Sequence, residues 1–229
     1  MPIIEIRNLT KIYGDHSVEV KAIDGISLTF DKGEFTAIVG PSGSGKTTFL
    51  NLLGGLDKPT SGEVVVDGTN IWDLPSGKLI DFRLHNIGFV FQAYNLIPVL
   101  TAGENIEFIM ELQGRTKKER NQRTKELLTA VGLSDREKSR PSNLSGGQQQ
   151  RVAVARALAS RPKFVLADEP TANLDSKSTE TLLEIMEKLN REEEVTFIFS
   201  THDARVVRKA RRIITIEDGK VLLDERVKK

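Results

Sequence analysis

The chain has 229 residues, of which 38% are hydrophobic and 28% charged, and its formal net charge is +1. This length suits one domain with a sizeable core, and the near-neutral charge argues against general electrostatic binding of nucleic acid. The absence of cysteine excludes disulfides and thiol chemistry. Because no apolar stretch approaches the ~20 residues that span a bilayer and no signal-peptide layout is present, we expect a cytoplasmic protein.

The first thirty residues predict antiparallel strands, because apolar and polar residues alternate over 4–7, 18–22 and 26–30. Tyr13 lies in the turn that follows the first of these strands, at residues 11–15. Its ring is predicted either to pack within the hairpin or to remain exposed as a surface on which an adenine stacks.

The sequence GPSGSGKT at residues 40–47 follows the apolar run 35–39 and precedes the helix-like stretch 48–53. This order of strand, glycine-rich loop and helix predicts a phosphate-binding site. Glycines let backbone N–H groups approach a phosphate, and the helix N-terminus attracts the same anion. We expect Lys46 to contact the β- and γ-phosphates and the Thr47 hydroxyl to bind Mg²⁺. The predicted nucleotide contacts here are Gly40, Pro41, Ser42, Gly43, Ser44, Gly45, Lys46, Thr47 and Thr48.

A further strand is predicted at residues 63–68, and an apolar strand at 87–91 is followed directly by Gln92. The region from 93 to 160 has helical patterns only, including a capping box at Thr101–Glu104 and a charged helix over 117–131. We therefore predict one domain over residues 1–229. Its α/β core comprises 1–92 and 161–229, and its helical subdomain comprises 93–160.

The sequence LSGGQ at residues 144–148 precedes a strongly helical run at 149–159. Ser145 is the predicted N-cap, and the two glycines expose backbone N–H groups at the start of the helix. This predicts a second anion-binding site. The spacing does not say whether it faces the first.

The run at 164–167 is entirely apolar, as expected of a parallel strand buried on both faces, and it ends at Asp168 and Glu169. Two carboxylates at the end of a buried strand are costly unless they hold a cation or a reacting group. In phosphate-loop ATPases the first helps to hold Mg²⁺ and the second polarises the attacking water. Ser176 is the predicted cap of the next helix.

The strand at 195–199 is followed by His202, at the end of the strand where open α/β sheets bind their ligands. His202 is predicted either to be a surface or a hydrogen-bonded core residue or to contact the phosphate. The basic stretch 205–212 is predicted to be a solvated helix face, not a nucleic-acid patch, and residues 213–223 a hairpin with its turn at 218–219.

In this order, the motifs resemble those of the ATP-binding subunit of ATP-binding-cassette (ABC) transporters, over essentially the whole chain. In that family the corresponding motifs are the Walker A loop, the Q-loop glutamine, the signature motif, Walker B with its catalytic glutamate, the D-loop and the switch histidine. Here they are residues 40–47, Gln92, 144–148, 164–169, 172–175 and His202. The resemblance implies an α/β fold: a P-loop NTPase core with a mixed sheet, an N-terminal antiparallel β subdomain and an inserted helical subdomain.

The resemblance also implies binding and hydrolysis of ATP with Mg²⁺. Glu169 would be the general base, His202 a γ-phosphate contact and Lys46 a charge stabiliser. Gln92 would link the metal and water to the region that docks a permease. The implied metal ligands are Thr47, Gln92 and Asp168. Tyr13 would stack on adenine, and the further nucleotide contacts would be Ser145, Gly146, Gly147, Gln148 and Asp175.

Two copies of the chain would enclose two ATP molecules head-to-tail, each site taking residues 40–47 from one copy and 145–148 from the other. The partners implied are this second copy and integral membrane permease subunits, which would hold the protein at the inner face of the cell membrane. No nucleic acid partner is expected.

Residues 91–98 and 168–176 resemble the lipoprotein-release and macrolide-export branch, which pairs a short ATPase with separately encoded permeases. Polar amino-acid importers have similar stretches, so an importer ATPase is an alternative. A regulatory ATPase that gates a partner without transport is a second alternative. A DNA-repair ABC ATPase is excluded, because 229 residues without sustained heptads leave no room for its long coiled coil.

Overall fold

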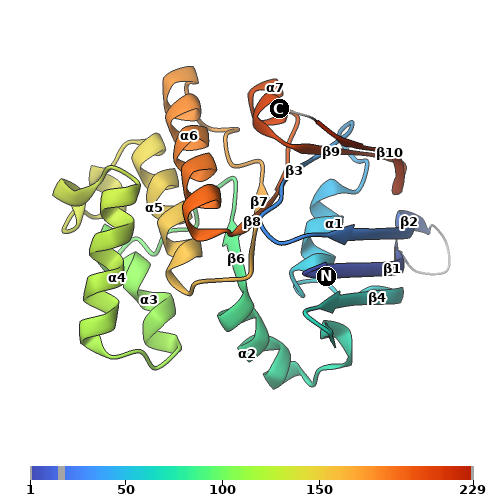
Figure 1. Cartoon of the computed structure of the whole chain (residues 1–229), viewed down its shortest axis with the longest axis horizontal. Helices are drawn as coiled ribbons and strands as arrows, with labels where there is room; N and C mark the ends of the chain where they lie inside the picture. Colours follow the sequence, from blue (N-terminus) through green and yellow to red (C-terminus); the bar gives the residue numbers. More distant parts are fainter. Residues whose placement is uncertain (1, 15–18, 228–229) are drawn as a thin grey trace.

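The computed structural model describes residues 2–14 and 19–227, which form two sheets and a group of helices (Figure 1). The strands are β1 (Ile4–Tyr13), β2 (Val20–Phe30), β3 (Phe35–Val39), β4 (Ser61–Val66), β5 (Thr69–Asn70), β6 (Ile87–Val90), β7 (Phe164–Asp168), β8 (Thr196–Ser200), β9 (Arg212–Glu217) and β10 (Lys220–Arg226). The α-helices are α1 (Lys46–Leu53), α2 (Ser76–Asn86), α3 (Ala102–Leu112), α4 (Lys117–Ala130), α5 (Gly146–Ala159), α6 (Ser176–Glu193) and α7 (Ala204–Lys209).

The smaller sheet is antiparallel, with strand order β2-β1-β4-β5. The alternating pattern predicted these strands, but the stretches at 18–22 and 26–30 do not form two strands. They form the single strand β2, which pairs with β1 from Tyr13–Val20 to Ile4–Phe30 and accommodates the irregularity by shifts in register. Such bulges let one long strand stay paired where its side-chain alternation is interrupted. Asp15 and Val18 lie outside the described residues.

The larger sheet has the order β10-β9-β3-β8-β7-β6, parallel from β9 to β6, with β10 antiparallel at the edge. Successive residues of β7 and β8 alternate between two hydrophobic cores. Val165 and Phe197 face one core, and Leu166 and Ile198 face the other. Because both faces are covered, these strands read as uninterrupted apolar runs in the sequence.

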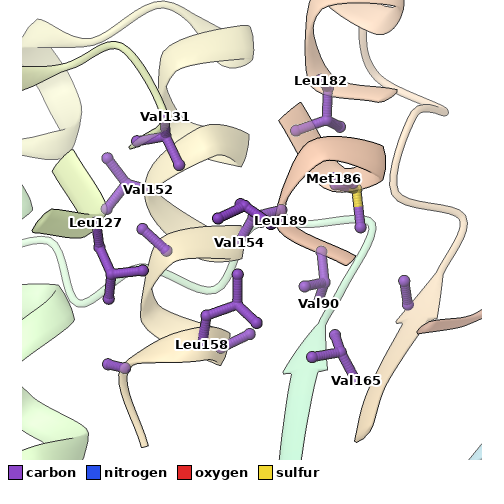
Figure 2. Close-up of a cluster of buried hydrophobic side chains, with 14 of the residues drawn as sticks. Val90, Leu127, Val131, Val152, Val154, Leu158, Val165, Leu182, Met186 and Leu189 are labelled. Atoms are coloured by element: carbon purple, nitrogen blue, oxygen red, sulfur yellow. The ribbon is translucent and has the colours of Figure 1, made fainter. Parts of the chain in front are cut away.

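One core joins this sheet to the helices (Figure 2). Leu127 of α4 and its C-cap Val131 lie beside Val152 of α5, and Leu189 of α6 lies on the side of that helix that faces α5. The other core joins the opposite face of the sheet to α1 and the antiparallel sheet. The fold class predicted from the sequence is confirmed. The described residues from 93 to 160 contain helices and no strand, while the boundaries of a helical subdomain stay a prediction.

The helix starts follow the local capping chemistry. Thr101 forms the predicted capping box at the start of α3, and Ser145 is the predicted N-cap of α5, where it forms a complete capping box with Gln148. The predicted Ser176 cap is wrong. Asp175 is the N-cap of α6 and accepts a hydrogen bond from the Ser178 backbone N–H at 2.9 Å, because a carboxylate one residue earlier has the reach to the third N–H. Within the part of the chain that the structure describes, no helix could cross a membrane.

Arg212 corrects the prediction that 205–212 is a solvated helix face. Helix α7 ends at Lys209, and Arg212 begins β9 with its side chain only 7% exposed. Its guanidinium donates to Glu34 at 2.9 Å and to Asp224 at 2.7 Å, and also to the Thr29 carbonyl. Burial alone would lower the pKa of Arg212, but the two carboxylates raise it above its usual range. This ion pair network ties β9 and β10 to the beginning of β3.

Replacing Arg212 by Met should lower the free energy of unfolding by about 2 to 4 kcal/mol, because it leaves two partly buried carboxylates without their cation. Urea unfolding followed by circular dichroism measures the change. The matched control is Arg191→Met. Arg191 pairs with Glu187 with its side chain 69% exposed, and this change should cost less than about 1 kcal/mol. Equal losses in the two variants would contradict the network's role.

Candidate functional site

Four parallel strands end at one edge of the larger sheet, and the predicted site residues follow them. Ile38 of β3 and Asp168 of β7 both pair with Ser200 of β8, so these strands end nearly level. The loops after them border a cleft of about 800 Å³. Its lining includes Gly40, Pro41, Ser42, Gly43, Gly45, Lys46, Thr47, Thr48, Gln92, Glu169, Ala172, Ser200, His202, Asp218 and Gly219. The structure therefore brings together most of the residues that the motifs nominated.

The loop before α1 has a backbone that only glycine adopts readily. Gly40, Gly43 and Gly45 have φ angles of 150°, 79° and 102°. A Cβ at Gly40 would also collide with the Ile216 carbonyl of β9. The β9–β10 turn braces the loop from the same side, since the Gly219 N–H donates to the Ser44 carbonyl at 3.1 Å. The loop is thus held open towards the cleft.

Lys46 and Ser44 have polar atoms suited to an anion. The Lys46 ammonium donates to the Gly40 and Pro41 carbonyls at 2.9 and 2.8 Å, at the loop itself. The Ser44 hydroxyl is buried and has no hydrogen-bond partner among the described residues. Together with the N-terminus of α1, these groups form a cradle for phosphate oxygens.

Thr47 and Asp168 lie together as the sequence predicted for metal ligands. The Thr47 hydroxyl donates to both carboxylate oxygens of Asp168, at 3.2 and 3.1 Å. A hydroxyl and a carboxylate are the hard oxygen ligands that Mg²⁺ accepts, with phosphates and waters completing its shell. The described residues contain no cluster of three or more acidic, histidine or cysteine side chains around a metal position. The donor set therefore fits Mg²⁺ bound with a polyphosphate.

Glu169 is held in a strained conformation beside His202. Its backbone has φ 45°, which is uncommon for a residue with a side chain, and its N–H donates to the Ser200 carbonyl at 2.9 Å. One carboxylate oxygen lies 2.7 Å from His202 Nδ1, and the other accepts a long bond from the Thr201 hydroxyl at 3.4 Å. The histidine side chain is 75% exposed on the cleft side. The pair places a carboxylate and an imidazole next to the phosphate loop.

Gln92 lines the cleft, whereas Tyr13 lies outside its lining. The Tyr13 hydroxyl donates to Asp57, and Lys11 lies over its ring at 4.7 Å. Burial and the hydrogen bond to Asp57 raise the pKa of Tyr13. The ring is 40% exposed, so it is neither a fully packed hairpin residue nor part of the cleft wall, and its adenine-stacking role stays a prediction.

Residues Ser145–Gln148 do not line the cleft formed by the described residues of this chain. Ser145 caps α5, and the glycines after it permit close packing against other segments. A Cβ at Gly146 would lie 2.8 Å from the Tyr94 hydroxyl oxygen, and one at Gly147 would lie 2.7 Å from Ser178 Oγ. Ser145 is exposed at a helix start that lies apart from the phosphate loop, and anion binding at this second site stays a prediction.

Asp175 is also outside the cleft lining. Both of its carboxylate oxygens are engaged at the start of α6, one by the Ser178 N–H and the other by the Ser178 hydroxyl. These bonds lower the pKa of Asp175. Its predicted contact with nucleotide stays a prediction.

Sequence reasoning missed several residues of the cleft wall, including Lys21, Ala22, Ser200 and the turn residues Asp218 and Gly219. The hydroxyl of Ser200 is buried without a partner among the described residues. A polar residue at the end of a buried apolar strand was the available signal for Ser200. Nothing local marks the other residues, because pairing with distant strands brings them to the site.

Comparison with known proteins agrees with this geometry. The family model described as "ABC transporter" matches residues 23–172. The chain is 47% identical, over 97% of its length, to the macrolide export ATP-binding/permease protein MacB of Hyphomonas neptunium, of which it spans 34%. It is 48% identical to the uncharacterized ABC transporter ATP-binding protein YvrO of Bacillus subtilis, with 97% of each chain covered.

A solved structure has the same fold over almost the entire chain. It is the dimeric, post-hydrolysis state of the ATP-binding cassette MJ0796 bound to ADP and Pi, and MJ0796 comes from Methanocaldococcus jannaschii. The TM-score is 0.90 and the sequence identity 43%, with 99% of each chain covered.

The segment that carries His202 is fixed by Asp203, which generates a pH prediction. Asp203 caps α7, accepts from Thr171 and pairs with Arg205 at 2.7 Å. The bond to Arg205 lowers the pKa of Asp203 from 3.8 to about 2. Because the pKa is lower in the folded chain, the carboxylate's contribution is complete above the unfolded value and is lost as pH falls from about 4 to about 2.

Asp203→Asn keeps a capping side chain but removes the charge. It should lower the free energy of unfolding by about 1 to 2 kcal/mol at pH 6, and the difference from wild type should shrink at pH 3. Urea unfolding at both pH values measures it. A difference that is the same at both pH values would show that the ionised carboxylate is not its source.

Proposed function

Because the chain belongs to the ABC transporter family, we propose that it is the ATP-binding and ATP-hydrolysing subunit of a membrane transporter. The observation that supports this proposal is the set of side chains gathered at the cleft. Thr47, which bonds to Asp168, and the Glu169–His202 pair line this cleft beside the phosphate loop. This combination supplies an anion cradle, a metal site and a carboxylate placed to act on water.

The residues at the cleft would have separate roles in ATP binding and hydrolysis. When bound, Mg²⁺ would be held by Thr47 and Asp168, with Gln92 nearby, and would neutralise charge on the triphosphate. Lys46 would exchange its carbonyl acceptors for phosphate oxygens and stabilise the charge of the transferred group.

Glu169 would orient the attacking water and accept its proton. The hydrogen bond between Glu169 and His202 supports this role, because it fixes the carboxylate at the mouth of the cleft. Among the described residues, Nε2 of His202 has no hydrogen-bond partner, so this ring nitrogen would contact the terminal phosphate.

The complete ATP site requires a second copy of the chain. Residues 145–148 present a capped helix start outside the cleft, where a second molecule's nucleotide could contact it. We place each ATP between the loop at 40–45 of one copy and residues 145–148 of the other. The dimeric state of the MJ0796 cassette supports this arrangement. ATP would then close the dimer, and hydrolysis would let it open.

A membrane permease is the proposed second partner, of the export or lipoprotein-release type. MacB, which the chain resembles over a third of that protein's length, is named as an ATP-binding/permease protein. Through the permease the chain would be held at the inner face of the membrane.

An apolar groove of about 320 Å³ is the proposed permease-docking surface, lined by residues that include Ile80, Arg83, Phe89, Phe91, Ile109 and Arg156. The rings of Phe89 and Phe91 lie parallel, with centroids 5.8 Å apart. Arg83 and Arg156 donate to backbone carbonyls and have no carboxylate partner among the described residues. Because an apolar wall beside Arg83, a cation without a carboxylate partner among the described residues, suits an apolar helix with an acidic residue, we assign the groove to such a segment of the permease.

Glu169→Gln should retain ATP binding but lower turnover by at least about 100-fold, because the amide cannot accept the proton of water. The variant should also accumulate as an ATP-bound dimer, visible by size-exclusion chromatography with light scattering. Lys46→Ala is the companion variant. It should weaken binding of a fluorescent ATP analogue to the monomer itself. Turnover at the wild-type rate in Glu169→Gln would overturn the assignment.

The groove is testable by cross-linking, because the chain has no cysteine of its own. Ile80→Cys, at a position 58% exposed, should cross-link in membranes of the source cell to a multi-span protein identified by mass spectrometry. Leu222→Cys, 60% exposed on β10, is the control and should not. Cross-links from Ile80→Cys only to soluble proteins would contradict the docking surface.

A further inference from the structure

Side chains of α5 hold the backbone on both sides of Gln92. The buried Gln150 donates through Nε2 to the Pro170 carbonyl at 2.7 Å and, more weakly, to the Phe91 carbonyl at 3.4 Å. Six residues further along α5, Arg156 donates to the Tyr94 carbonyl at 2.9 Å and also to the Asn95 carbonyl. The segment 91–95 is thus attached at its two ends to one helix.

The attached segment is strained. Tyr94 and Asn95 have φ angles of 55° and 49°, the left-handed region that residues with side chains seldom adopt in succession. Such a turn persists only where surrounding contacts impose it, and the bonds from Arg156 go to its two carbonyls. Without them, the turn would relax and Gln92 would lose its fixed position.

Arg156 is committed to this turn. Burial lowers its pKa, and no carboxylate pairs with it among the described residues. A buried cation satisfied by carbonyls alone is costly, so the position is unfavourable for folding in general. This favours a specific role in holding the turn.

The same turn contacts the start of α5 and the segment after Glu169. The Tyr94 hydroxyl lies over Gly146, where a Cβ would be 2.8 Å away, and makes a long bond to the Asn173 carbonyl. The Asn173 side chain donates to the Gln92 carbonyl at 3.0 Å. Gln92, the strained turn and the α5 N-terminus therefore form one connected set of contacts.

We propose that Gln150 and Arg156 are positioning residues that fasten the backbone on both sides of Gln92 to α5. As a result, Gln92 at one chain's nucleotide cleft and Ser145–Gln148, which face the partner's nucleotide, move as one unit. The inference rests on the proposed ATP-dependent dimer. It adds that occupancy of one site is transmitted to the other through these side chains, neither of which touches nucleotide.

The test uses ATP-dependent dimerisation in the Glu169→Gln background. Arg156→Met should leave the affinity of the monomer for a fluorescent ATP analogue within about 3-fold of wild type, because the phosphate loop is untouched, yet should raise the ATP concentration needed for dimerisation at least about 10-fold. Arg156→Lys, which keeps the charge and one donor, should give partial rescue. Gln150→Leu removes only the second attachment and should give a smaller effect in the same direction.

The control is Arg123→Met. Arg123 is a partly buried arginine that bonds to Glu193 and the Leu158 carbonyl, away from residues 91–95. It should lower the melting temperature without changing ATP-dependent dimerisation. Dimerisation of the Arg156 and Gln150 variants at the same ATP concentration as the control would overturn the inference. Failure of Glu169→Gln alone to dimerise would instead overturn the proposed function.

Hydrogen–deuterium exchange provides a readout that does not need the dimer. Arg156→Met should speed exchange of peptides covering 91–100 at least about 10-fold in the ATP-free monomer, and Arg123→Met should not. In wild type, ATP should shift the exchange of 91–100 and 145–150 together. In Arg156→Met, ATP should shift the exchange of 91–100 but not that of 145–150. Independent shifts in wild type would contradict the coupling.

Discussion

The level ends of strands β3, β7 and β8 are the constraint on which the site depends. Ile38 and Asp168 both pair with Ser200, and this register places the phosphate loop, two carboxylates and His202 at one edge of the sheet. Because side chains alternate between the faces of a strand, a shift of one residue in the register of β7 would turn Asp168 away from Thr47 and Glu169 away from His202. The two hydrophobic cores prevent that shift, because Val165 is buried in the core on one face of the sheet and Leu166 in the core on the other face. Packing on both faces of the sheet thus holds the site residues in position.

In the proposed dimer, the cleft at this edge of the sheet supplies one half of each ATP site. Its lining includes most of the loop at 40–47 and Glu169, and Asp168 bonds to Thr47 of that loop, but the capped start of α5 lies outside the cleft. Helix α5 nevertheless reaches back to the cleft through Gln150 and Arg156, which hold the segment around Gln92. The same helix lines the proposed docking groove with Arg156. Helix α5 therefore connects the cleft with the surface proposed for the second copy and with the proposed permease-docking groove, as coupling between these events would require.

The sequence was informative wherever a local rule decides the structure. The glycine loop at 40–45, the capping boxes at Thr101 and Ser145, and the apolar run before Asp168 each need only neighbouring residues to be recognised. Errors arose where distant residues decide. Arg212 is buried because Glu34 and Asp224 meet it across strands, and β2 is continuous because β1 pairs along it. Helix α2, with no buried residue, has too little apolar patterning to predict. The strained turn at Tyr94 has no local signal either.

In the proposed dimer each ATP site combines the loop of one copy with residues 145–148 of the other, and mixed dimers test this arrangement. Ser145→Asp keeps a capping side chain but repels phosphate, and Lys46→Ala disables the loop. Each variant alone should be inactive. An equal mixture should recover about a quarter of wild-type ATPase activity, since half of the dimers carry one intact site. The comparison is a mixture of wild type with the double variant Ser145→Asp/Lys46→Ala. The arrangement would be contradicted if the two single variants recovered no activity when mixed while wild type kept full activity per wild-type chain beside the double variant.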